Sequence, residues 1–156
     1  MNRPVILIGN GLRNNPGLFA QLNGLGTPIL TTWMACDLLP EDSPVFCGRP
    51  GIYGQRAANI IQQKATSLHC FGARLDEQQV AYRYDLFAPK AKKYIYDIDH
   101  AELDKLPDNW YKSDHDSIMI EGHHDWLNWC KALYYHFRPE LEGIEDPDFV
   151  DPFTFY

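Results

Sequence analysis

Short apolar segments alternate along the chain with longer segments in which apolar residues recur every three or four positions. Short β-branched runs bounded by glycine, proline or polar residues are typical of buried strands, and the longer spacing is typical of amphipathic helices. The predicted strands are Val5–Ile8, Thr27–Thr32, Ser67–Phe71, Lys93–Ile98 and Ser117–Ile120. The predicted helices are Pro16–Asn23, Gln55–Lys64 and Asp125–Phe137. This alternation predicts an α/β fold of three layers, α/β/α, in which helices cover both faces of a parallel sheet.

Two further segments lack a regular period. Residues 36–54 contain three prolines and three glycines, which favours a shaped loop. Residues 138–156 are rich in proline, aspartate and glutamate, which is typical of a linker. We therefore expect one folded domain over residues 1–137, followed by a linker over residues 138–156.

Polar or glycine-rich loops follow four of the predicted strands. They are Gly9-Asn10-Gly11, Thr31-Thr32, Gly72-Ala73-Arg74 and Asp97-Ile98-Asp99. The carboxyl ends of parallel strands meet at one edge of a sheet, and the ligands of such folds bind beyond that edge. The sequence therefore predicts a binding crevice built from these loops.

Glycine-rich segments in this set have both a ligand-binding and a structural interpretation. Gly9 and Gly11 would let backbone amides approach a diphosphate, although Asn-Gly is also a common tight-turn dipeptide. The segment Gly48–Asn59 has three glycines around Tyr53 and leads into a helix, an arrangement that suits an anion or a cofactor.

Charged residues at the strand ends are equally open to two interpretations. Asp97 and Asp99 are placed either to accept hydrogen bonds from ribose hydroxyls or to cap a helix that begins at His100. Arg74 is placed either to pair with a phosphate or a flat ring, or to form a surface ion pair with the acidic residues at 76 and 77.

Composition narrows the function classes. The net charge of −7 argues against broad nucleic-acid binding, and the longest apolar runs are strand-sized, so we expect no membrane span. The four cysteines form no CxxC pair, which favours reduced thiols in a cytoplasmic protein over a zinc site. Adjacent His123 and His124 would point to opposite sides of an extended segment, so we predict no metal site. No GxSxG or Walker motif is present, and we assign no catalytic residue.

Several blocks together resemble the central domain of acetolactate synthase-type enzymes that use thiamine diphosphate. The blocks are RPVILIGNG (Arg3–Gly11), TPILTTW (Thr27–Trp33), DLLPEDSPVFCGRPGIYGQRAAN (Asp37–Asn59), FGARLD (Phe71–Asp76), FAPKAKKYIYDIDHAELDKL (Phe87–Leu106) and the terminal VDPFTFY. The resemblance covers nearly the whole chain in matching order, and VDPFTFY resembles the truncated start of a following domain. The sequence DLLP…GRPGIYGQR is most similar to the corresponding segment of acetolactate synthase-like proteins encoded in surface-polysaccharide gene sets.

The resemblance implies a Rossmann-like sheet of the DHS-like NAD/FAD-binding type, with six parallel strands, in a parent of three domains. The other two domains of the parent hold thiamine diphosphate and magnesium, so the isolated domain is not expected to be active. The parent would decarboxylate a 2-oxo acid such as pyruvate and transfer the two-carbon unit. Its partners would be those two domains and, in a homo-oligomer, further copies.

The resemblance also implies where FAD would lie in this domain. The implied contacts are Gly9, Asn10, Gly11, Thr32, Trp33, Met34, Gly51, Ile52, Tyr53, Gly72, Ala73, Arg74, Asp76, Asp97 and Ile98. Three departures count against FAD: Gln78 stands where FAD-binding relatives have an arginine, Glu121-Gly122-His123 replaces a GD-small segment, and the stretch between the first two strands is short. Members of the family bind FAD, ADP or nothing.

Two alternatives remain at this point. A structural domain with an empty crevice would have the same fold and would support oligomer assembly. A stand-alone nucleotide-binding enzyme, such as a sirtuin-like deacylase, would need paired CxxC motifs, which the sequence lacks.

Overall fold

The computed structural model describes residues 2–114 and 120–137 and contains a five-stranded sheet in the order β2-β1-β3-β4-β5. Every neighbouring pair of strands in this sheet is parallel, as predicted. The strands are β1 (Pro4–Ile8), β2 (Ile29–Thr31), β3 (Ser67–Phe71), β4 (Lys92–Tyr96) and β5 (Tyr111–Ser113). All five residues of β1 are buried, which explains why this strand is apolar throughout and does not alternate.

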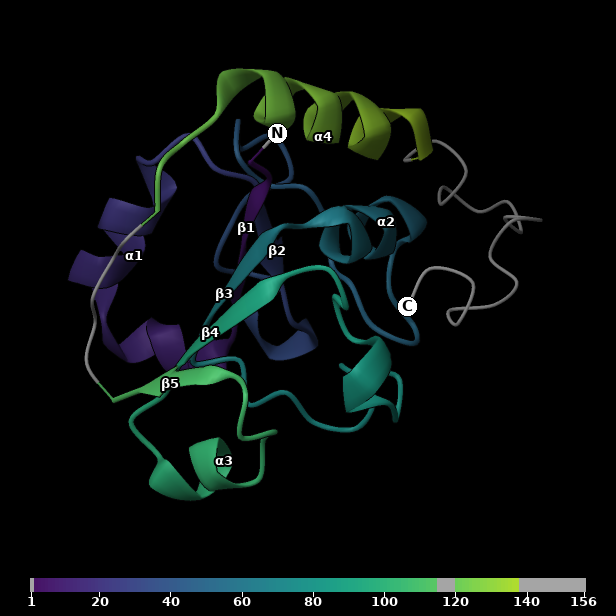
Figure 1. Ribbon diagram of the computed structural model, residues 1–156. Coiled ribbons are helices and arrows are strands. Elements are labelled where there is room, and N and C mark those ends of the chain that lie inside the picture. The colour runs from purple at the N-terminus through teal and green to yellow at the C-terminus, as the bar shows by residue number, and fades with distance from the viewer. Residues whose placement is uncertain (1, 115–119, 138–156) are drawn as a thin grey trace.

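Helices flank the sheet on both sides, with α1 and α2 on opposite sides in Figure 1. The helices are α1 (Pro16–Asn23), α2 (Arg56–Lys64), α3 (His100–Asp104) and α4 (His124–Phe137). Three short 3-10 helices join them: η1 (Asn10–Asn14), η2 (Trp33–Ala35) and η3 (Tyr84–Leu86). The predicted α/β/α arrangement is confirmed, and α1, α2 and α4 begin within one residue of the predicted positions.

Local sequence accounts for where α1 begins. The Asn15 side chain accepts a hydrogen bond from the Leu18 amide at 3.1 Å, which satisfies one of the free donors of the first turn. Pro16 takes the first helical position, where its missing N–H costs nothing. Leu18 and Leu22 are buried and fix α1 against the sheet.

Rings are stacked across three neighbouring strands on one face of the sheet. His69 of β3 stacks on Tyr94 of β4 with ring centroids 4.7 Å apart, and Tyr94 stacks on Tyr111 of β5 at 4.9 Å. Phe71 and Tyr96 form a second stacked pair at 4.6 Å. These cross-strand pairs match the parallel register of the strands and help to fix it.

The loop predicted over residues 36–54 contains a short stretch that pairs with the outer edge of β2. Ile29 and Phe46 form a parallel bridge, with the Ile29 amide donating to the Val45 carbonyl at 2.8 Å and the Cys47 amide to the Ile29 carbonyl at 2.9 Å. Among the described residues the sheet thus has five strands and this bridge. The resemblance implies six strands.

The sheet contains a strand, β5, that the sequence did not predict. Tyr111–Ser113 pairs with β4, whereas residues 117–119 of the predicted strand Ser117–Ile120 lie outside the described residues. Tyr111–Ser113 has one apolar residue in three and half-exposed side chains, so its hydrophobic pattern is too weak to mark it as a strand. The linker predicted over residues 138–156 also lies outside the described part of the chain.

Candidate functional site

The strand order places a natural crevice between β1 and β3. From β1 the chain moves outward to β2, then crosses back to the other side of β1 to form β3. The connections that follow β1 and β3 therefore diverge at their carboxyl ends, which is where ligands bind in open α/β sheets. Gly9 directly follows β1 and Gly72 directly follows β3.

Backbone contacts between these two loops explain the glycines. A Cβ on Gly9 would lie 2.3 Å from the carbonyl oxygen of Gly72, and one on Gly72, whose φ is +60°, would lie 2.8 Å from Cα of Gly11. The Gly9 amide donates to the Phe71 carbonyl at 2.9 Å, and the Gly11 amide donates to the Gly72 carbonyl at 3.2 Å. Loop packing thus requires these glycines, and the two amides are already used within the protein.

A cavity of about 440 Å³ lies on one side of this glycine contact. Its volume is within the roughly 300–1,000 Å³ that small-molecule sites occupy. Eleven of the predicted site residues line it: Asn10, Thr32, Trp33, Met34, Gly51, Ile52, Tyr53, Gly72, Ala73, Arg74 and Asp76. The structure thus brings together residues from four loops that are far apart in the sequence.

Exposed apolar side chains are concentrated in this cavity. Trp33, Met34 and Tyr53 all line it, with 54%, 71% and 62% of their surfaces exposed. The Arg49 guanidinium lies 5.9 Å from the centre of the Trp33 ring. Large exposed apolar groups are costly in water, and two aromatic rings at a cavity offer stacking surfaces for a flat ligand.

Hydrogen bonds fix the loop that carries Gly51, Ile52 and Tyr53. Asn59 of α2 is buried and bonds the Gly51 backbone twice, accepting from its amide at 2.9 Å and donating to its carbonyl at 3.1 Å. The Gln79 side chain donates to the Pro50 carbonyl at 3.2 Å. The predicted platform over Gly48–Asn59 is therefore a preformed loop.

Arg13 fixes the opposite wall of the cavity. Its guanidinium makes a two-pronged pair with Asp37, at 2.7 and 3.0 Å, and donates to the Met34 carbonyl at 3.2 Å. It also donates to the Asn10 side chain at 3.1 Å. The Asn10 carboxamide oxygen is thus held by Arg13, and the loops after β1 and β2 are joined.

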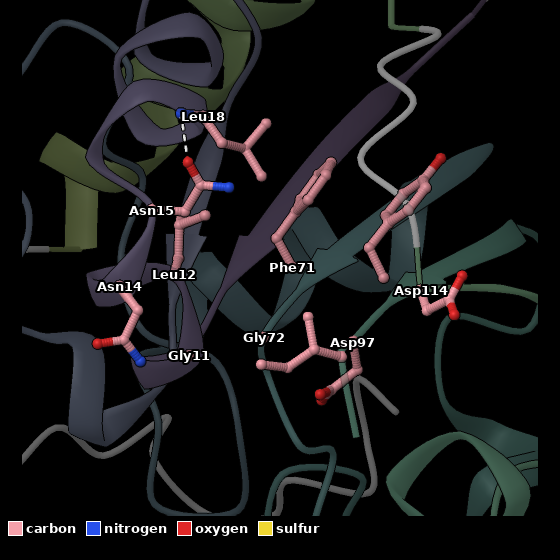
Figure 2. A pocket seen from close by; sticks show the side chains of 11 residues that line it. Gly11, Leu12, Asn14, Asn15, Leu18, Phe71, Gly72, Asp97 and Asp114 are labelled. Atoms are coloured by element: carbon pink, nitrogen blue, oxygen red, sulfur yellow. Dashed lines mark hydrogen bonds between the residues drawn. The ribbon is translucent and has the colours of Figure 1, made fainter. Parts of the chain in front are cut away.

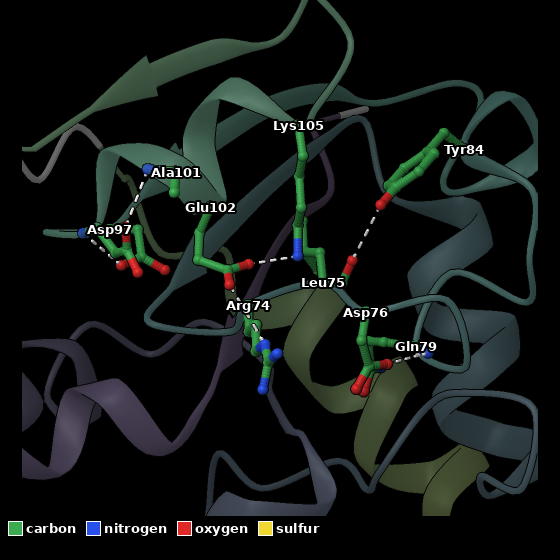
Figure 3. A network of polar contacts seen from close by, with 10 residues as sticks. Arg74, Leu75, Asp76, Gln79, Tyr84, Asp97, Ala101, Glu102 and Lys105 are labelled. Atoms are coloured by element: carbon green, nitrogen blue, oxygen red, sulfur yellow. Dashed lines mark hydrogen bonds and ion pairs between the residues drawn. The ribbon is translucent and has the colours of Figure 1, made fainter.

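Arg74 has a different partner from the one that sequence suggested. Its Nε lies 3.3 Å from Oε1 of Glu102 in α3, and Glu102 also pairs with Lys105 (Figure 3). The acidic residue at position 76 instead accepts from the Gln79 amide at 2.9 Å and holds a turn. Of the two interpretations of Arg74, a surface ion pair is present, but with Glu102 rather than with its neighbours in sequence.

A second cavity of about 250 Å³ lies on the other side of the glycine contact (Figure 2). Gly72 lines both cavities, and the predicted residues Gly11, Asp97 and Ile98 line this one. The stacked rings of Phe71 and Tyr96 form part of its wall. Of the predicted site residues only Gly9 lines neither cavity, since its neighbour is the Gly72 backbone.

The structure gives the two aspartates after β4 different positions. Asp99 accepts from the Ala101 amide at 2.9 Å and caps α3, as the structural interpretation predicted. Asp97 lines the smaller cavity while one of its oxygens accepts from the Asp99 amide at 3.0 Å. A carboxylate at a strand end of such a sheet is suited to accept hydrogen bonds from ribose hydroxyls.

Asp114 is a cavity residue that sequence reasoning missed. It directly follows β5, lines the smaller cavity and lies 3.3 Å from His100. The sequence did not predict β5, which explains the omission. The weak apolar pattern of Tyr111–Ser113 offers no signal from which Asp114 could have been found.

Three of the four cysteines are buried, and His123 has a structural hydrogen bond. Burial raises the pKa of the Cys47 thiol to about 12 and also raises the pKa values of Cys70 and Cys130, so these thiols stay protonated near neutral pH. His123 accepts a hydrogen bond from the Trp126 amide at 3.3 Å. Within residues 2–114 and 120–137, no group of three or more His, Cys, Asp and Glu side chains is placed to hold a metal ion. None of the helices in those ranges has the length and apolar character of a membrane span.

Comparison with known proteins assigns the chain to a family. Residues 1–111 match the family model described as the thiamine pyrophosphate enzyme, central domain. The chain belongs to this central-domain family. The match includes β1 to β4 and all but one of the residues that line the two cavities, the exception being Asp114.

Relatives of this central domain carry acetolactate synthase names. The chain is 34% identical to the acetolactate synthase isozyme 1 large subunit of Escherichia coli, over 76% of the chain and 22% of that protein. It is 34% identical to an acetolactate synthase of Mycobacterium bovis, over 95% of the chain and 28% of that protein. A probable acetolactate synthase large subunit of Methanocaldococcus jannaschii is 36% identical over 66% of the chain. The chain therefore spans less than a third of the length of these relatives.

Proposed function

We propose that this chain is the central domain of a larger acetolactate synthase-like enzyme and that its crevice holds FAD or a related adenine nucleotide. The observation that carries the proposal is the position of the cavities. Fourteen of the fifteen residues expected to contact a flavin line two cavities that meet at the β1/β3 switch point. Membership of the family and the names of the relatives support the parent enzyme.

The side chains present suit the parts of a flavin dinucleotide. Trp33, Met34 and Tyr53 would face the flat ring, and Arg74 would pair with the diphosphate. Asp97 in the smaller cavity would accept hydrogen bonds from a ribose. Because the Gly9 and Gly11 amides are used within the protein, the diphosphate would depend on the Arg74 side of the crevice. The bound flavin would have a structural role.

The parent enzyme would use thiamine diphosphate and magnesium, bound outside this segment, to decarboxylate a 2-oxo acid such as pyruvate and transfer the two-carbon unit. The carbanion chemistry of such a reaction belongs to the thiamine cofactor. This domain would contribute subunit and domain positioning in a cytoplasmic homo-oligomer, with the other two domains of the parent as its partners. Thiamine-dependent release of CO₂ from pyruvate by the parent is the expected activity, and its absence with all simple 2-oxo acids would overturn this half of the proposal.

Calorimetric titration with FAD and with ADP tests the cofactor half. We expect one equivalent of FAD or ADP to bind to the chain, and purified parent to carry flavin absorbance if FAD is the natural ligand. A lack of heat with both ligands, in the chain and in the parent, would remove the cofactor claim and leave the parent enzyme untouched.

A structural domain with an empty crevice is the second candidate. Two observations favour it: the used amides of the glycine loop, and Gln78 in the cavity wall at the position where FAD-binding relatives were expected to have an arginine. This candidate predicts the same fold and oligomer support, with no ligand in the titrations above.

A further inference from the structure

Arg74 is the only basic side chain among the described residues that line the larger cavity, so its orientation decides how that cavity handles phosphate. The side chain is 76% exposed, and an exposed arginine samples many rotamers. Ordering such a side chain on binding lowers the affinity. Any contact that orders Arg74 before the ligand arrives reduces that loss.

The backbone at Arg74 is already held in an uncommon conformation. Arg74 and Leu75 have φ values of +59° and +46°, and the Leu75 amide donates to the Ala73 carbonyl at 2.6 Å. Left-handed φ values at residues other than glycine cost energy and persist where the surroundings enforce them. The buried Leu75 side chain and the hydroxyl of Tyr84, 3.4 Å from the Leu75 carbonyl, enforce it here.

The fixed backbone does not orient the Arg74 side chain by itself, and Glu102 provides the contact that does. One carboxylate oxygen lies 3.3 Å from Nε of Arg74, so the pair leaves the two terminal nitrogens of the guanidinium outside that contact (Figure 3). The other oxygen pairs with Lys105, which offsets the negative charge of Glu102. The site therefore keeps the positive charge that a phosphate needs.

Glu102 is itself set on a fixed element. Asp99 caps α3, and the buried side chains of Leu103 and Leu106 anchor the helix to the core. Only 22% of the Glu102 side chain is exposed, against 76% for its partner. The carboxylate is thus the fixed member of the pair and the guanidinium the adjustable one.

We propose that Glu102 is a positioning residue that orients Arg74 for a phosphate-containing ligand in the larger cavity, an inference that rests on the proposed function. Glu102 does not touch the ligand; it acts through Arg74. An ion pair with a solvent-exposed partner contributes little to folding stability, so the contact has little value for stability alone.

The test is calorimetric binding of ADP, with FAD as the second probe, to wild type, E102A, E102Q, R74A and the R74A/E102A double variant. We expect E102A to bind about fivefold more weakly, corresponding to about 1 kcal/mol. E102Q keeps an oxygen that accepts from Nε and should bind close to wild type. In the R74A background, E102A should have no further effect, because Glu102 acts only through Arg74.

E77A is the matched control, since it removes an acidic side chain of the same loop that lines neither cavity. It should bind as tightly as wild type. If E102A binds ADP as tightly as wild type or more tightly, the proposal is overturned, since Glu102 then gives no help to binding or competes with phosphate. The proposal is also overturned if the R74A/E102A double variant binds ADP more weakly than R74A. If wild type itself binds neither ADP nor FAD, the proposed function fails and this inference fails with it, a result distinct from any difference among variants.

Discussion

The carbonyl oxygen of Gly72 accepts a hydrogen bond from the Gly11 amide at 3.2 Å, at the place where the two cavities of the crevice meet. This contact joins the loop after β1 to the loop after β3. It leaves no space for a side chain on either loop, because a Cβ on Gly9 or Gly72 would lie within 3 Å of backbone atoms.

Alanine at Gly72 should therefore destabilise the protein. The residue has a φ of +60°, and its Cβ would lie 2.8 Å from Cα of Gly11. Because both the φ value and the backbone contact resist a side chain, we expect Gly72→Ala to lower the free energy of unfolding by more than about 2 kcal/mol. Urea unfolding followed by circular dichroism measures the loss.

Gly17→Ala is the matched control, since a Cβ there meets nothing nearer than 3.9 Å and the residue lies in α1. It should be neutral or stabilise the protein by up to about 1 kcal/mol. A Gly72→Ala protein as stable as Gly17→Ala would mean that the two loops do not pack as described.

Gln62 is expected to make the protein less stable than an apolar side chain of the same length would. It is completely buried, and neither its Oε1 nor its Nε2 has a hydrogen-bond partner among the described residues. Burying a polar group without a partner costs about 1–3 kcal/mol. Gln62→Met, which keeps the length of the side chain, should therefore raise the thermal midpoint of unfolding.

The neighbouring residue Gln63 should respond in the opposite way to substitution by methionine. Its side chain donates to the Leu86 carbonyl at 2.8 Å and accepts from the Ala88 amide at 2.9 Å, so the same substitution should lower the midpoint. Thermal melts of the two variants are directly comparable. Equal destabilisation by both would show that Gln62 has partners.

His69 should make the protein less stable in acid. Burial lowers its pKa to about 4, from an unfolded value of about 6.5. Between these values the unfolded state binds the proton and the folded state does not, so stability is full above pH 6.5 and falls as the pH drops towards 4. The loss is about 1.4 kcal/mol per pH unit, roughly 3 kcal/mol over the window.

His69→Phe keeps a ring that can stack on Tyr94 and removes the titrating group. Unfolding free energies of wild type and variant, measured from pH 4 to pH 7, should differ increasingly as the pH falls, in favour of the variant. Parallel curves would contradict the buried, neutral state of His69.

Trp33 should contribute to flavin affinity and little to folding. Its ring is 54% exposed in the larger cavity, and stacking of an aromatic side chain on a base is worth about 1–3 kcal/mol. We expect Trp33→Ala to weaken FAD binding about tenfold at an unchanged thermal midpoint, measured by quenching of flavin fluorescence. Trp129→Ala, which removes a 42% exposed tryptophan of α4, should leave FAD affinity unchanged.

Much of the fold was predictable because the central elements are governed by local patterns. β1 is a continuous apolar run ended by glycine, β3 is a short, largely buried segment also ended by glycine, and α1 has a capping asparagine followed by proline. β5 was not predictable in this way. It is three residues long at the sheet edge, and pairing with β4 rather than its own apolar pattern makes it a strand.

The candidate site was predictable at the level of loops but not of partners. Strand ends gather at one edge in any parallel sheet, so Gly72, Arg74 and Asp97 could be placed near one another from sequence. The pairing of Arg74 with Glu102 depends on how α3 packs, and the use of the Gly11 amide depends on the approach of two loops that lie sixty residues apart. Such contacts arise only in the folded chain.

Chemical-shift mapping by NMR tests the crevice most directly. ADP added to the ¹⁵N-labelled chain should shift the backbone amide signals of Gly72, Arg74 and Asp97 in a saturable manner and leave those of α4 unchanged. Saturable shifts confined to α4, or no shift at millimolar ADP and FAD, would contradict a nucleotide site between β1 and β3.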